Sequence, residues 1–70
     1  MRDVVISSEP VELYKILKFE GVVGSGGQAK AVIAEGLMLV NGEVETRKRR
    51  KILSGDVITF ADDELKMRLS

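Results

Sequence analysis

The pattern of the chain changes at Gly36, from helical spacing before it to short strand-like runs after it. In the first half, apolar residues recur three and four positions apart, as they do on one face of a helix. In the second half, β-rich runs alternate with turn residues, and Asn41-Gly42 is a strong signal for a two-residue hairpin. Seventy residues suffice for one small domain with little spare core. We therefore predict an α+β fold in which a two-helix hairpin packs on a small, mostly antiparallel sheet.

The first helix is predicted to begin near Pro10, because proline suits a first helical turn. Ser8 or Glu9 would cap this helix, and Gly21 is a natural end for it. Its buried face would consist of the apolar residues at helical spacing, which are Leu13, Ile16 and Leu17.

The second helix is predicted from Ser25 to just before Gly36, since Ser25 and Gln28 have the spacing of a capping box. Its apolar stripe is formed by Ala29, Val32 and Ile33. Few residues separate the two helices, so we expect them to pack as a hairpin. Gly26 and Gly27 leave amides at the start of the second helix unshielded, and this end is either simply capped or also meets an anion such as an RNA phosphate.

The remaining segments are predicted to be strands. Residues 4–6 read as an edge strand, and the other four runs are residues 37–40, 43–46, 57–60 and 65–69. A polar turn at residues 61–64 would join the last two runs. In the last run the apolar side chains should face inward and the cations outward, which sets Leu65, Met67 and Leu69 against Lys66 and Arg68.

The hairpin at Asn41-Gly42 leaves one question open. A two-residue turn pairs Val40 with Glu43 on one face and Leu39 with Val44 on the other, so neither face is purely apolar. Either the turn is longer, or one face of the hairpin is only partly covered.

Five consecutive cations at residues 47–51 stand in a chain whose formal net charge is zero. Such a run usually belongs to a tail, to a solvated surface or to a site that meets an anion. This run is no tail, because it lies between two strand-like stretches. Held in a fold, it can neutralise several phosphates, and nucleic acid is therefore the first partner to consider.

Three lysines on the predicted helices extend this charge. Lys15 and Lys18 lie three residues apart, and Lys30 lies near the start of its helix, where a cation gains nothing from the helix dipole and suggests an anion nearby. Ordinary solvation is the plain alternative for each of them. Aromatic residues are scarce, which argues against base stacking and favours recognition of a folded or double-stranded RNA by shape and phosphate.

The chain has few of the residues that usually carry catalysis or bind metal ions. Cysteine and histidine are absent, so the usual thiolate and imidazole ligands and the commonest general base are missing. The acidic cluster Asp62-Asp63-Glu64 could bind Mg²⁺, although a solvated turn is the plainer interpretation. We expect no catalytic residue, no metal and no cofactor. Residues 1–9 lack the apolar core of a signal peptide and no apolar run reaches membrane-span length, so a soluble, cytoplasmic, monomeric protein is expected.

An ordered set of short motifs resembles the S4 RNA-binding domain family. The motifs are Ser25, Gln28-Ala29-Lys30, Ile33 with Gly36, Val40-Asn41-Gly42 and Gly55-Asp56-Val57-Ile58. The match runs from about residue 11 to residue 60 and indicates a single S4-like domain over residues 1–70. The whole chain is most similar to the small, stand-alone bacterial S4-like proteins of the YbcJ type.

The resemblance implies an α-L fold, with two packed helices before a small sheet and RNA on the face of the helical hairpin. Family positions that often carry cations hold Val11, Gly26 and Leu39 here, and we expect the run at residues 47–51 to replace them. The expected RNA-binding residues are Lys15, Lys18, Ser25, Gln28, Lys30, Asn41, Arg47, Lys48, Arg49, Arg50 and Lys51.

The function predicted from these observations is non-enzymatic binding of structured RNA, such as rRNA or tRNA, through a basic surface. The alternative is a protein-interaction module that uses the same charges to dock on an acidic partner in a ribosome or RNA-processing assembly.

Overall fold

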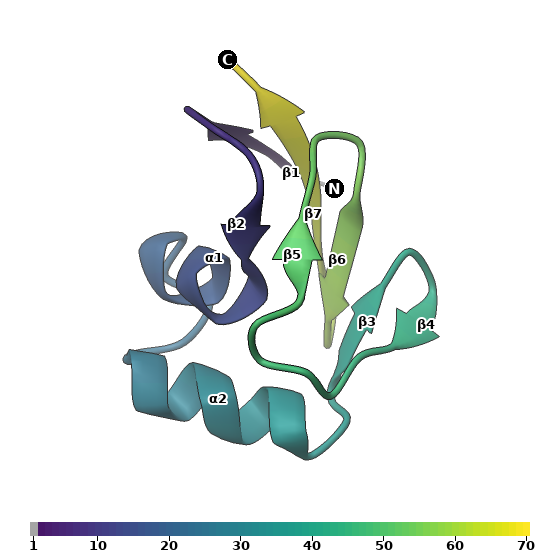
Figure 1. The fold of residues 1–70 in the computed structure, drawn as a ribbon. Coiled ribbons are helices and arrows are strands. Elements are labelled where there is room, and N and C mark those ends of the chain that lie inside the picture. The colour runs from purple at the N-terminus through teal and green to yellow at the C-terminus, as the bar shows by residue number, and fades with distance from the viewer. Residues whose placement is uncertain (1) are drawn as a thin grey trace.

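The computed structural model describes residues 2–70, as two helices and seven strands (Figure 1). In chain order these are β1 (Arg2–Ile6), β2 (Val11–Glu12), α1 (Leu13–Phe19), α2 (Gly26–Ala34), β3 (Met38–Val40), β4 (Glu43–Val44), β5 (Lys51–Ile52), β6 (Val57–Phe60) and β7 (Asp63–Leu69).

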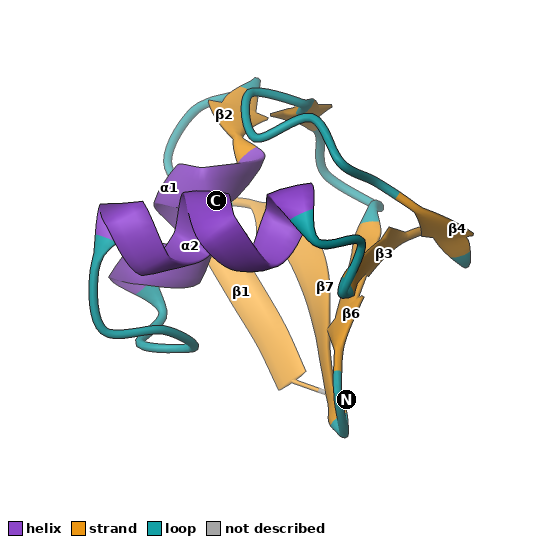
Figure 2. Ribbon diagram, turned by 90° about the horizontal axis from the view of Figure 1, so that it is seen from below, coloured by secondary structure: helices purple, strands orange, loops and turns teal. Residues whose placement is uncertain are grey.

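Five of the strands form one sheet in the order β1-β7-β6-β3-β4, and β2 and β5 form a separate pair. The contact between β1 and β7 is parallel and the others are antiparallel. Figure 2 shows both helices on one side of the larger sheet, and β1 lies at its edge. The predicted α+β architecture, a helical hairpin on a mostly antiparallel sheet, is confirmed, and so is the edge position of the first strand.

The predicted start of the first helix is wrong. Pro10 lies outside α1, and the two residues after it form β2, in which Val11 pairs with Ile52 of β5. Glu9 does not cap the helix either, because its carboxylate accepts a hydrogen bond of 2.8 Å from the amide of Ser54. A strand contact with a distant part of the chain therefore replaces the first helical turn that proline suggested.

The second helix begins where the sequence placed it. The hydroxyl of Ser25 accepts a hydrogen bond from the amide of Gln28 at 3.1 Å. The reciprocal bond of a capping box goes instead to the preceding residue, because Gln28 Oε1 accepts from the amide of Gly24 at 2.7 Å. Gly36 follows the helix with φ of +78°, the left-handed conformation in which helices commonly end.

The hairpin between β3 and β4 has the predicted register, with Leu39 opposite Val44 and Val40 opposite Glu43. Both turn residues have positive φ, 53° at Asn41 and 85° at Gly42, as a tight two-residue turn of this kind requires. Val40 is buried, whereas Val44 is 61% exposed. The open question is thus answered by a short turn and a hairpin of which one face is only partly covered.

The core lies between the helices and the inner face of the larger sheet. Fully buried side chains come from both layers, among them Leu13, Leu17, Ile33, Met38, Ile58, Leu65 and Met67. The prediction for Leu69 is wrong, because this side chain is 46% exposed at the end of β7. Lys66 and Arg68 are exposed as expected.

Candidate nucleic-acid interface

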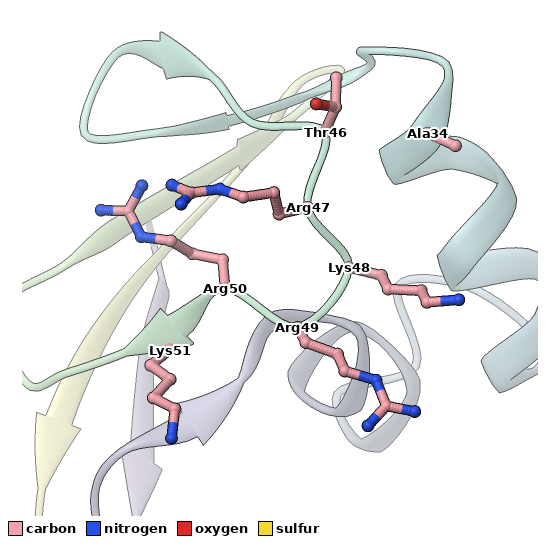
Figure 3. Close-up of a pocket in the computed structure, with 7 residues that line it drawn as sticks. All are labelled: Ala34, Thr46, Arg47, Lys48, Arg49, Arg50 and Lys51. Carbon is pink, nitrogen blue, oxygen red and sulfur yellow. The ribbon is translucent and has the colours of Figure 1, made fainter.

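Residues 46–51, named here the basic loop, follow β4, end at the first residue of β5 and carry all five consecutive cations. With Ala34 of α2 they line a shallow, open depression of about 820 Å³ (Figure 3). The loop lies on the helix side of the molecule, and Figure 3 shows Lys48 pointing toward α2.

The backbone of the basic loop is fixed to the start of α1. The amide of Leu13 donates to the carbonyl of Arg50 at 2.9 Å, and the amide of Tyr14 donates to the carbonyl of Lys48 at 3.1 Å. The first amides of a helix have no partner within the helix, and the residue before α1 provides no side-chain cap. The loop carbonyls fill that need, so α1 and the basic loop hold each other in place.

A buried carboxylate divides the run of cations into two groups. Glu45 is only 5% exposed and accepts hydrogen bonds from the amide, Nε and Nη2 of Arg47 at 2.9, 2.9 and 3.0 Å. Nη1 of Arg50 donates to the same carboxylate at 2.7 Å. These bonds, those from the Arg47 side chain first, hold the pKa of Glu45 far below its usual range. Arg47 and Arg50 therefore act as counter-ions to Glu45, and the Arg47 side chain is still 73% exposed.

The other three cations of the run remain available to a ligand. Lys48, Arg49 and Lys51 are exposed, and the structure of residues 2–70 gives none of them an ion pair. Figure 3 shows Lys48 and Arg49 pointing away from the side on which Arg47 and Arg50 lie. Within residues 2–70, three of the five cations thus have no ion pair, whereas Arg47 and Arg50 are paired with Glu45.

The depressed pKa of Glu45 predicts a pH dependence of stability. A carboxyl with a lowered folded-state pKa stabilises the fold fully above its unfolded pKa, about 4.3, and this contribution is lost as the pH falls below that value. We expect the stability difference between the wild type and Glu45→Gln to be constant above about pH 5 and to shrink at pH 3. Thermal melts of both proteins at several pH values check this, and a difference that stays constant down to pH 3 contradicts it.

The helical lysines are partly engaged by their neighbours. Lys30 Nζ lies 4.9 Å from the centre of the Tyr14 ring, and Lys15 Nζ lies 5.9 Å from it and 3.1 Å from Glu12 Oε1. The face of the Tyr14 ring attracts the Lys30 ammonium group. This contact explains why a cation lies near the start of α2 even if no anion binds there. The aliphatic part of Lys18 lies beside Gly26 at the start of α2.

The predicted polar contacts fall in two places. Ser25 and Gln28 lie at the start of α2 and are bonded to backbone amides there. Asn41 is held in the hairpin turn, where its Nδ2 donates to Asp56 at 3.0 Å and its Oδ1 accepts from the amide of Val57 at 2.9 Å. Both polar atoms of the Asn41 side chain are thus bonded within the sheet region. Neither bond joins Asn41 to the helical hairpin.

Sequence reasoning missed two residues of the site, Glu45 and Tyr14. An acidic side chain just before five cations was a usable signal for Glu45, because arginine forks bind carboxylates in pairs of hydrogen bonds. No sequence signal places Tyr14, since its contacts with Lys30 and with the basic loop depend on the packing of separate elements.

The acidic residues at 62–64 do not form a cluster. Asp63 and Glu64 belong to β7, where they pair with Phe60 and Thr59. Successive strand residues point to opposite faces, so these two carboxylates diverge. Within residues 2–70 no group of three acidic side chains is arranged to hold a metal ion. The same part of the chain contains no helix long and apolar enough to cross a membrane.

Residues 4–68 match the model of the S4 domain family, and the chain therefore belongs to that family. The protein named "Putative RNA-binding protein YbcJ" from Escherichia coli (strain K12) is 57% identical over 51 residues, which cover 73% of each chain. "Probable ribosome maturation protein RlbA" from Bacillus subtilis (strain 168) is 42% identical over 53 residues, covering 76% of this chain and 75% of the relative.

Two solved structures share the fold. The solution structure of Escherichia coli YbcJ, described as revealing an alfaL motif involved in RNA-binding, superposes with a TM-score of 0.71 and 44% identity over 93% of this chain and 84% of that one. The crystal structure of a pseudouridylate synthase also gives a TM-score of 0.71, with 25% identity, and it covers 80% of this chain. That match spans only 24% of the synthase chain.

Proposed function

We propose that this protein is a non-enzymatic RNA-binding protein that recognises structured RNA, such as rRNA or tRNA, through its basic loop and helical hairpin. The observation that carries the proposal is the attachment of the basic loop to the first amides of α1, with Lys48 and Arg49 exposed beside the helices. Cations fixed in this way can meet neighbouring phosphates without first being ordered.

The comparisons support RNA as the ligand class. YbcJ carries RNA-binding in its name and its structure is described with an RNA-binding motif, and RlbA is named for ribosome maturation. The pseudouridylate synthase resembles this chain over a quarter of the synthase's length only.

We assign the phosphate contacts to Lys48, Arg49 and Lys51, with Lys18 beside the start of α2. Arg47 and Arg50 shape the loop, while Lys15 and Lys30 lie around Tyr14 and add long-range positive potential. Ser25 and Gln28 order the start of α2, and Asn41 orders the hairpin. Contacts of this kind position an RNA, and specificity then comes from its shape.

The experiment is a titration of the purified protein with a tRNA and with an unstructured RNA of equal length, in the absence of any other protein. We expect tighter binding to the tRNA, and a plot of log K against log salt in which the three cations of the basic loop contribute a slope of about −2 to −3, at roughly 0.7–0.9 each. Absence of RNA binding would refute the proposal and would favour docking on an acidic protein, which uses the same charges.

A further inference from the structure

Glu45 is the one charged residue within residues 2–70 that the fold buries, and it lies immediately before the basic loop. Its two carboxylate oxygens receive four hydrogen bonds, three from Arg47 and one from Arg50. The amide of Arg50 also donates to the carbonyl of Arg47 at 3.1 Å, which closes a turn around Lys48 and Arg49. The carboxylate therefore fixes both ends of the turn that carries two of the exposed cations.

The bonds to Glu45 affect both the side chains and the backbone carbonyls of the basic loop. With Arg47 and Arg50 drawn to one side by Glu45, Figure 3 shows Lys48 and Arg49 pointing to the other. The carbonyls of Lys48 and Arg50 meanwhile face the amides of Tyr14 and Leu13. One buried carboxylate thus orients the cations and the carbonyls that cap α1.

We propose that Glu45 is a positioning residue for the RNA-binding surface: it adds a negative charge beside the site, yet it strengthens RNA binding by holding Lys48 and Arg49 in place. The RNA part of this inference rests on the proposed function. The sign of the effect separates positioning from simple electrostatics, because removing a negative charge near an RNA site should tighten binding if charge alone matters.

The test compares Glu45→Gln with Glu43→Gln, which removes the same charge two residues away on the exposed strand β4. Positioning predicts that Glu45→Gln raises the Kd for tRNA about 5–8-fold, equivalent to about one lost phosphate contact at 0.1 M salt. Glu43→Gln should bind as tightly as the wild type or slightly more tightly. Equal or tighter binding by folded Glu45→Gln would overturn the inference.

A second variant covers the case in which Glu45→Gln fails to fold. Arg47→Lys combined with Arg50→Lys keeps every charge and removes the forked guanidinium bonds to Glu45. Positioning predicts weaker tRNA binding at unchanged net charge, and wild-type affinity in this double variant would overturn the inference.

A third readout does not depend on RNA. In folded Glu45→Gln the amides of Leu13 and Tyr14 should exchange with solvent faster than in the wild type, because their acceptors lie in the loop that Glu45 holds. Unchanged protection of both amides would show that Glu45 does not hold the loop. If the wild type bound no RNA while these amides lost protection, the proposed function would fail and the role of Glu45 in positioning the loop would stand.

Discussion

Replacing Lys48 and Arg49 together by glutamine is expected to raise the Kd for structured RNA about 30-fold at 0.1 M salt. Both side chains are exposed and project away from the Glu45 cluster, so their charge is available to phosphates. Two lost contacts, at roughly 0.7–0.9 each, should also flatten the salt dependence by about 1.4–1.8 units of slope. Titrations with a tRNA over a series of salt concentrations measure both quantities.

The matched control is the pair Lys66→Gln and Arg68→Gln, which likewise removes one lysine and one arginine. These residues lie on the outward face of β7, opposite to the buried Leu65 and Met67 that face the helices. Net charge changes equally in both double variants, so a specific phosphate site predicts a large slope change only for the loop pair. Equal loss of affinity in the two variants would show that total charge, and not the basic loop, governs binding.

The two helices show what local sequence can and cannot determine. Ser25 and Gln28 are three residues apart, so the cap of α2 is a local matter and was predictable. Pro10 gave an equally local signal for α1, but Val11 pairs with Ile52 from the other half of the chain. A strand pairing between distant segments overrides a helix-start preference, and no local pattern contains it.

The candidate site, like the helices, was predictable only where the signal is local in sequence. The run of cations was visible in the sequence, whereas its division into counter-ions and exposed charges depends on the burial of Glu45. Asn41 was predicted as an RNA contact because it belongs to a family motif, yet its side chain is bonded to Asp56 and Val57. The Asn41 side chain thus stabilises the turn in which it lies.

The polar turn predicted at residues 61–64 was too long for a related reason. The β6–β7 loop is shorter than the polar segment suggests, because Asp63 and Glu64 already belong to β7. Ala61 adopts a positive φ of 53° in this tight turn. Alanine rarely adopts this conformation, so the sequence does not predict a turn there. Charged residues at the exposed end of a strand therefore looked like part of a loop.

Leu17→Ala is expected to have the largest effect on stability, a loss of about 3 kcal/mol and roughly 15–20 °C in Tm. The Leu17 side chain is fully buried in the core between the helices and the sheet. Helix α1 has only seven residues, too few to be stable without packing, and it also holds the basic loop through two amides. Thermal and urea unfolding measure the loss, and RNA binding should disappear at temperatures where the variant is unfolded.

Phe19→Ala is the matched comparison on the same helix. It removes a larger apolar side chain, but Phe19 is 69% exposed, so we expect a change within about 0.5 kcal/mol. Lys18 Nζ lies 5.9 Å from the Phe19 ring centre, an exposed contact that adds little to stability. A loss at Phe19 as large as that at Leu17 would contradict the packing described here, because it would place the Phe19 face of α1, rather than the Leu17 face, against the core.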